Sequence, residues 1–225
     1  MKAFPEFKDF SEVRAKYPLT KVGWGGTRRI CLKIGETGYC VKFYWPREYY
    51  ESERIPARIQ KEIERKRFDL RSNACAQEVQ RYESFWLKQP QAIRAKLLPT
   101  VELVYDAEWG YGILETYFTN PDGTAIIPYE FEIKRQTCKE TQREILRQAE
   151  ELLEALARVS APFYEPGNFH TRLLPDGRVE TKIVDFEPTP KTAIPIEKYC
   201  AFWRRLKLRR KARRYLKHIR ETYGL

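Results

Sequence analysis

The spacing of hydrophobic residues changes several times along this 225-residue chain. In residues 28–45, β-branched and aromatic side chains flank a Gly-Glu-Thr-Gly connection, which predicts two strands joined by a turn at residues 35–38. Residues 100–106 and 111–118 predict two more strands, with a turn at residues 108–110. The first half of the chain is therefore expected to be mostly β-sheet.

Helical spacing appears in two segments around these strands. From Asn73 to Leu87, apolar and aromatic residues share one helical face. This face comprises Cys75, Val79, Tyr82 and Trp86. Further along, Thr137 and Glu140 form a capping-box pattern ahead of aliphatic residues that recur every 3.6 residues as far as Val159. The pattern predicts one packed helix in the first half and a longer one in the second.

Three other segments complete the pattern. Residues 47–72 carry eight Lys+Arg, six Asp+Glu and few large apolar side chains, so we expect an exposed insertion or a solvated helix rather than core. A turn at residues 175–177 lies between two short strands that end at Asp185. Residues 196–223 predict a basic helix, with ten Lys+Arg and no acid between Trp203 and Arg220.

Composition narrows the class of protein. With 42% hydrophobic and 14% aromatic residues the chain can bury a core, so it is not a disordered protein. The sequence has no apolar run long enough to span a membrane and no signal-peptide pattern at its start, which predicts a cytoplasmic protein. Five isolated cysteines and two histidines predict reduced thiols and no structural zinc. The formal charge of +11 suits a polyanionic partner, such as nucleic acid, an acidic membrane surface or a phosphorylated ligand.

In chain order, the elements resemble the protein-kinase-like fold: a glycine-rich turn, a strand with a lysine, a helix with a glutamate, two strands and a long helix. The glycines are Gly23, Gly25 and Gly26, and such a loop lets backbone N–H groups approach phosphate. The turn departs from the G-x-G-x-x-G pattern, and by itself it is equally an ordinary hairpin turn.

The resemblance implies a nucleotide-binding set on the first strands. Lys42 matches the lysine that holds the α- and β-phosphates of ATP, and Cys40 would lie against the adenine. Glu78 on the following helix would orient Lys42 by an ion pair, with Glu83 as the competing candidate. The alternatives are a strand lysine that faces water and a solvated helix glutamate.

A second group of residues completes this implied site. Glu115 to Tyr117 would form the linker whose backbone meets the adenine, so Glu115 and Tyr117 are candidate nucleotide-binding residues. Asn168, and Asp185 in Asp185-Phe186, match the two kinase residues that hold Mg²⁺. Taken singly, each could instead be a turn asparagine and a strand-terminal aspartate.

One position departs from the kinase pattern. Five residues before Asn168, where the catalytic aspartate belongs, the chain has Phe163, whose ring cannot accept a proton. Glu165 lies two residues further on and is the remaining candidate for a catalytic role. The sequence therefore favours ATP and Mg²⁺ binding over phosphoryl transfer, including a pseudokinase that recruits a protein partner.

At the family level, the chain resembles the YrbL family, proteins of the PhoP regulatory network of bacteria. The resemblance covers roughly residues 22–118 and 160–219 and depends on several motifs taken together. They are GWGGTRRICLKIGETGYCVKFY, AQEVQRYESF, GYGILETYFTNPDGT, FYEPGNFHTRLL with IVDFEP, and KLRRKARRYLKH. The resemblance implies a small kinase-like protein of the response to low magnesium and envelope stress.

The basic C-terminal segment offers a different function. Leu208, Ala212, Tyr215 and Ile219 fall on one helical stripe, and the cations of Arg204–Arg220 surround it. Such a helix can bind nucleic acid or anionic lipid, or it can pack on the rest of the protein while its cations face water.

Taken together, these observations predict a two-lobed α+β fold of the protein-kinase-like type. Residues 1–118 would form an N-terminal lobe of antiparallel sheet plus one helix. Residues 119–225 would form a short, mainly helical C-terminal lobe.

Overall fold

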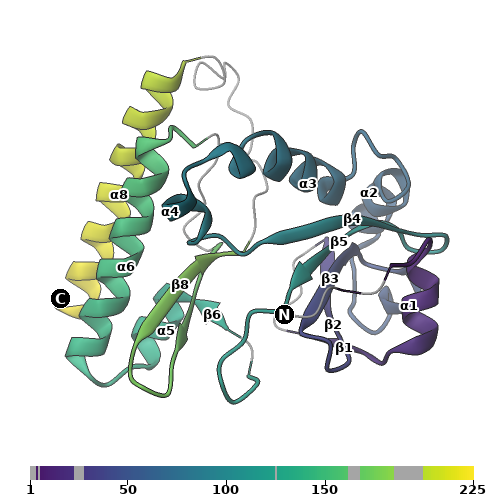
Figure 1. Cartoon of the computed structure of the whole chain (residues 1–225), viewed down its shortest axis with the longest axis horizontal. Helices are drawn as coiled ribbons and strands as arrows, with labels where there is room; N and C mark the ends of the chain where they lie inside the picture. Colours follow the sequence, from purple (N-terminus) through teal and green to yellow (C-terminus); the bar gives the residue numbers. More distant parts are fainter. Residues whose placement is uncertain (1–3, 5, 23–27, 125, 162–167, 185–199) are drawn as a thin grey trace. The chain divides into compact units, whose positions relative to one another are not determined.

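A computed structural model of the chain describes residues 4, 6–22, 28–124, 126–161, 168–184 and 200–225 (Figure 1). The fold is α+β, with an antiparallel sheet in the N-terminal part and mostly helices in the C-terminal part. That much of the predicted fold class is confirmed.

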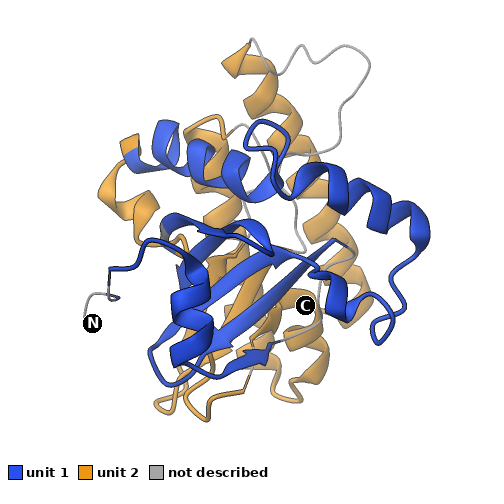
Figure 2. Cartoon of the chain, turned by 90° about the vertical axis from the view of Figure 1, so that its right-hand side faces the viewer, with its two compact units in different colours: residues 1–87, 99–118 blue, residues 88–98, 119–225 orange. Residues whose placement is uncertain are grey.

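The chain divides into two compact units, which Figure 2 shows in different colours. The first unit comprises residues 1–87 and 99–118, and the second comprises residues 88–98 and 119–225. Residues 88–98, which the sequence placed in the first lobe, belong to the second unit. There the Leu98 amide donates a hydrogen bond to the Ile183 carbonyl at 3.0 Å.

The first unit is built on a five-stranded antiparallel sheet with the order β1-β2-β3-β5-β4. Its strands are β1 (Leu19–Lys21), β2 (Arg29–Ile34), β3 (Tyr39–Tyr44), β4 (Thr100–Asp106) and β5 (Gly110–Thr116). Both predicted hairpins are confirmed. In the β2–β3 turn, Gly35 and Gly38 have φ of 44° and 79°, a left-handed conformation that suits glycine.

One face of this sheet carries the main hydrophobic core. Helix α1 (Phe10–Lys16) lies on it, and Phe10, Val41 and Phe43 are fully buried. The rings of Phe10 and Phe43 lie 5.1 Å apart, and Trp109 packs 5.4 Å from Phe43. Alternation along β3 therefore directs its odd-numbered residues into this core.

The charged segment 47–72 is less separate from the core than its composition predicts. It contains the 3-10 helix η1 (Arg47–Tyr49) and helix α2 (Ala57–Lys66), so the predicted helix is present. However, Ile55 and Ile63 are buried in the core of the first unit. A few aliphatic residues on one side of a charged segment are enough to attach it to the core. The prediction that this segment lies outside the core is therefore wrong.

Helix α3 (Ala74–Ser84) and the 3-10 helix η2 (Trp86–Lys88) replace the single helix expected over residues 73–87. Asn73 is the N-cap, and its side chain accepts a hydrogen bond from the Ala76 amide at 3.1 Å. Cys75 and Val79 are buried against Ile113 of β5. Helix α3 therefore covers the face of the sheet opposite the main core.

The second unit combines helices with a three-stranded antiparallel sheet of order β6-β7-β8. Its elements are α4 (Gln91–Arg94), β6 (Ile127–Pro128), α5 (Tyr129–Arg135), α6 (Lys139–Arg158), β7 (Phe169–Leu173), β8 (Val179–Ile183) and α8 (Ala201–Tyr223). The predicted hairpin after the long helix is confirmed as β7 and β8.

Helix α6 begins later than the predicted capping box requires. Its first residue is Lys139 and its N-cap is Cys138, so the pairing expected of Thr137 and Glu140 is wrong. Its aliphatic side is buried as predicted, from Ile145 to Leu156. Helix α8 runs alongside α6 (Figure 1), and its Arg204 donates to the Ser160 carbonyl at 3.0 Å, just past the end of α6.

Gly112 marks a close approach in the centre of the first sheet. A β-carbon at this position would lie 2.5 Å from Cε1 of Phe43 and 2.7 Å from the Lys42 carbonyl oxygen. We expect Gly112→Ala to lower the free energy of unfolding by about 1–3 kcal/mol, because the core has no room for the added methyl group.

Urea denaturation followed by circular dichroism measures this change. Ser84→Ala, at an exposed site at the end of α3, is the control and should stay within about 0.5 kcal/mol of the wild type. A Gly112→Ala variant as stable as the control would show that the sheet can accommodate a side chain here.

Candidate functional site

The second face of the first sheet carries polar side chains from three strands. Lys42 of β3 lies opposite Cys31 of β2 and Ile113 of β5, and Cys40 lies opposite Glu115. Side chains directly opposite each other in a sheet share one face. The pairing therefore gathers two thiols, an ammonium and a carboxylate on the face that α3 covers.

Lys42 and Glu115 form a buried ion pair on this face. The Lys42 Nζ lies 3.0 Å from Oε2 and 3.1 Å from Oε1 of Glu115. The Lys42 side chain is 15% exposed and that of Glu115 is 2% exposed. The carboxylate therefore holds the ammonium in one position, while part of the lysine stays within reach of solvent.

Arg29 and Glu78 form a second buried ion pair. Nη1 of Arg29 on β2 lies 2.6 Å from Oε2 of Glu78 on α3, and the two side chains are 10% and 0% exposed. Because burying a charge is costly unless it meets its opposite, this contact ties α3, which packs over β4 and β5, to β2 as well.

Sequence analysis predicted that Glu78 would form the ion pair with Lys42. In the structure, Glu115 forms the ion pair with Lys42, and Glu78 forms an ion pair with Arg29. Glu115 was expected to contribute its backbone to a linker, whereas here its side chain lies on the sheet. The competing candidate, Glu83, is exposed.

Sequence reasoning missed Arg29 as a member of this group. The signal was present, because alternation along β2 puts Arg29 on the same face as Cys31. On the neighbouring strand β3, Tyr44 lies opposite Arg29 and Lys42 lies opposite Cys31. Arginine at the start of a strand was indistinguishable from the other basic residues of the segment.

Thiols lie beside both ion pairs. The hydrogen bond with Cys31 and the burial of the side chain raise the pKa of the Cys40 thiol well above its usual value. Burial raises the pKa of the Cys75 thiol to about 12, and burial also raises the pKa of the Tyr117 hydroxyl. These groups are therefore neutral at physiological pH, and the two buried ion pairs carry charge on this face.

Six positions that the sequence analysis singled out lie outside the described residues. They are Gly23, Gly25, Gly26, Phe163, Glu165 and Asp185. The strands on either side of residues 23–27 pair with each other, with Leu19 opposite Ile34. Asn168 immediately precedes β7, and its carbonyl accepts from the Val184 amide at 2.9 Å.

Within the ranges that the structure describes, no three His, Cys, Asp or Glu residues lie close enough together to hold a metal ion. Nor does any helix in those ranges combine the length and apolar character that crossing a bilayer requires.

Comparison with known proteins adds no relative. No protein-family model matches the chain, and no curated protein matches it in sequence.

The Lys42–Glu115 ion pair should be energetically coupled. Lys42→Met or Glu115→Gln leaves the opposite charge buried without this partner, so each variant should lower the free energy of unfolding. The double variant should lose less than the sum of the two, with an interaction energy of about 0.5–3 kcal/mol in a double-mutant cycle by urea denaturation.

Lys33 and Glu36 provide the matched control. They form an ion pair at 2.7 Å, but the Glu36 side chain is 92% exposed. The same cycle on this pair should give about 0–1 kcal/mol. If the losses at Lys42 and Glu115 added to within about 0.3 kcal/mol, the pair would have no energetic role.

The thiols should differ in reactivity. Cys138 is exposed at the N-cap of α6, where the backbone and side chain of Thr141 lower the pKa of its thiol. A lowered pKa gives more thiolate at neutral pH, so iodoacetamide should modify Cys138 before Cys40 and Cys75.

Peptide mapping by mass spectrometry after timed alkylation measures this order, with Cys138→Ser as the control that removes the fast phase. Equal rates at Cys138 and Cys40 in the folded protein would contradict the burial of the sheet face.

Proposed function

We propose that the polar face of the first sheet binds the phosphates of ATP and that the protein is a kinase-like nucleotide-binding protein. The observation that carries this proposal is the Lys42–Glu115 pair. In kinase-like proteins a carboxylate on the helix after the lysine strand fixes the lysine that meets phosphate, and here Glu115 of the neighbouring strand fixes the partly exposed Lys42 instead.

The order of the elements supports the same proposal. Strand β3 with Lys42 follows the β1–β2 pair, and α3 with Glu78 lies between β3 and β4 in the chain. The glycines at 23, 25 and 26 belong to the connection from β1 to β2, where a backbone free of β-carbons can approach phosphate.

The charges of the face imply a role for a divalent cation. Two carboxylates balance Arg29 and Lys42, so a polyphosphate entering this face would bring uncompensated negative charge. Mg²⁺ supplies that compensation in kinase-like sites. From the sequence, Asn168 and Asp185 are the residues that we propose to hold it.

The sequence favours a protein that binds ATP without transferring its phosphoryl group efficiently. Phe163 occupies the position of the catalytic aspartate, and Glu165 is the nearest carboxylate in the chain. A regulatory pseudokinase of the YrbL and PhoP-network type, acting through a protein partner, would need the nucleotide site but not the base.

A thermal-unfolding titration tests nucleotide binding. MgATP at ~100 times its dissociation constant should raise the melting temperature of the wild type by roughly 5–10 °C. Lys42→Met should show no such shift, and ATP with a chelator in place of Mg²⁺ should give a much smaller one.

Lys61→Met is the matched control, because Lys61 is exposed on α2. It loses the same charge and should keep the full shift. Equilibrium dialysis with labelled ATP at a temperature where both variants are folded separates lost binding from lost stability. Retained ATP affinity in folded Lys42→Met would overturn the assignment.

A further inference from the structure

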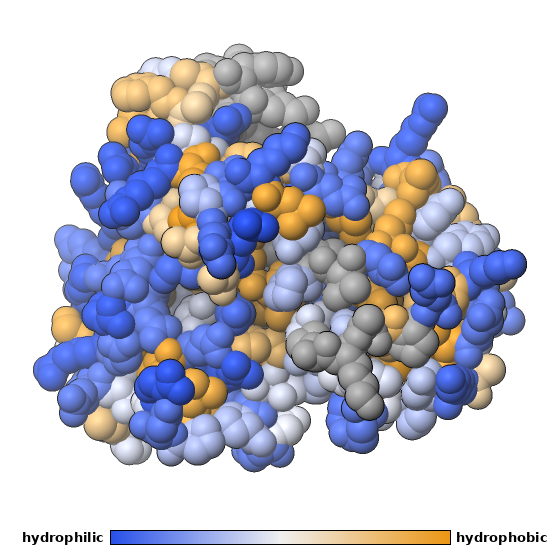
Figure 3. Space-filling model, viewed as in Figure 1, coloured by the Kyte–Doolittle hydropathy of each residue, from blue (hydrophilic) through white to orange (hydrophobic). Residues whose placement is uncertain are grey.

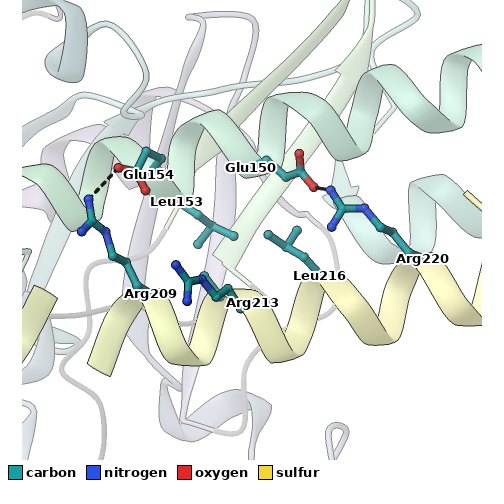
Figure 4. Close-up of a pocket in the computed structure, with 8 residues that line it drawn as sticks. Glu150, Leu153, Glu154, Arg209, Arg213, Leu216 and Arg220 are labelled. Carbon is teal, nitrogen blue, oxygen red and sulfur yellow. Dashed lines mark hydrogen bonds and ion pairs between the residues drawn. The ribbon is translucent and has the colours of Figure 1, made fainter. Parts of the chain in front are cut away.

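The cations of α8 fall into two groups according to what they contact. Arg209 lies 2.9 Å from Glu154 of α6, and Arg220 forms an ion pair with Glu150 (Figure 4). Leu153 and Leu216 lie between these two pairs in the groove that separates the helices. The first group of cations therefore attaches α8 to α6.

The second group forms no ion pair with α6 among the described residues. Arg210, Arg213, Arg214 and Lys217 are all exposed, and their spacing of three and four residues puts them on one side of the helix. Among the described residues, Arg210, Arg213 and Arg214 have no ion-pair partner, and Lys217 contacts Glu221 at 3.6 Å. Within the described parts of the chain, these cations therefore do not attach α8 to α6 by ion pairs.

The groove between α6 and α8 adds to this positive charge. It has a volume of about 560 Å³ and is lined by three arginines and two glutamates. Arg209 and Arg220 neutralise the glutamates, so Arg213, which lies between them in Figure 4, is the excess charge.

Large apolar side chains continue the same side of α8 toward its N-terminal end. Phe202 is 67% exposed, Trp203 is 52% exposed and Leu206 is 46% exposed. Leu206 lies one helical turn before Arg210, so the apolar and cationic residues form one continuous surface. Figure 3 shows the mainly hydrophilic surface over α6 and α8 on its left-hand side, with apolar colours at the upper end.

We propose that this surface, the α8 outer face, docks on an anionic phospholipid bilayer. The α8 outer face comprises Phe202, Trp203, Leu206, Arg210, Arg213, Arg214 and Lys217. Its aromatic and leucine side chains would enter the headgroup region, where tryptophan and phenylalanine are favoured, and its cations would contact lipid phosphates.

The chemistry of the α8 outer face favours a bilayer over nucleic acid. Residues 201–221 contain no Asn, Gln, Ser or Thr, the uncharged side chains that commonly bond base edges. Phe202 and Trp203 offer rings on which a base can stack, but Leu206 offers none, whereas all three side chains can enter lipid.

Flotation of the full chain with vesicles tests the proposal and does not depend on nucleotide binding. The wild type should bind phosphatidylethanolamine/phosphatidylglycerol vesicles and not phosphatidylcholine vesicles, and binding should weaken in high salt. The triple variant Arg210→Gln, Arg213→Gln, Arg214→Gln should lose roughly 100-fold in partition coefficient. The variant Phe202→Ser, Trp203→Ser, Leu206→Ser should lose at least about 10-fold.

The control is the variant Arg58→Gln, Lys61→Gln, Arg65→Gln, which removes three exposed charges from α2. It should bind the vesicles within about twofold of the wild type if the location of the charge matters. Circular dichroism and the melting temperature check that all three variants are folded.

Three outcomes would overturn the proposal. The wild type could fail to bind the anionic vesicles, the control could lose as much binding as the α8 variants, or the serine variant could bind as the wild type does. A single-stranded RNA oligonucleotide is assayed in parallel. Binding of RNA through Arg210, Arg213 and Arg214 without binding of vesicles would assign the α8 outer face to nucleic acid instead.

Discussion

The first unit depends on the neutralisation of charge on a sheet that is covered on both sides. Helix α1 and the hydrophobic core cover one face, and α3 covers the other, where Arg29 and Lys42 are almost withdrawn from water. An isolated buried charge costs several kcal/mol, and Glu78 and Glu115 offset this cost for Arg29 and Lys42. The Arg29–Glu78 pair therefore helps to hold α3 on the sheet, and Glu115 sets the direction in which the Lys42 side chain points. The same contacts thus contribute to the stability of the first unit and to its proposed function.

The sequence was sufficient for most of the strands and long helices, because each has a clear period of its own. The β2–β3 and β4–β5 hairpins, α6 and α8 follow from alternation, turn residues and helical spacing. Helix α1 and the short elements β1, α5 and β6 are too brief to show a period. The partner of Lys42 could not be predicted, because Glu78 and Glu115 are both compatible with the spacing and only the pairing of β3 with β5 distinguishes them.

Helix α8 shows how one charged segment can serve two purposes. Sequence analysis offered a packed helix with solvated cations and a polyanion-binding helix as alternatives. The structure divides the cations between these roles by their position around the helix axis, since Arg209 and Arg220 meet glutamates of α6 while Arg210 and Arg214 are exposed on the outer side. The buried stripe is narrow, with Leu216 and Ile219 at its centre, so half the circumference remains for another surface.

The place of β5 in the sheet has a consequence for the growing chain on the ribosome. Strand β5 lies between β3 and β4, so the edge of β3 stays unpaired until residue 116 has been made. Synthesis at roughly 5–20 residues per second keeps that edge open for seconds. During this interval the nascent chain presents Val41 and Phe43 beside unpaired backbone N–H and C=O groups. Strands of neighbouring chains associate through such edges, so a chaperone would be most useful at this stage.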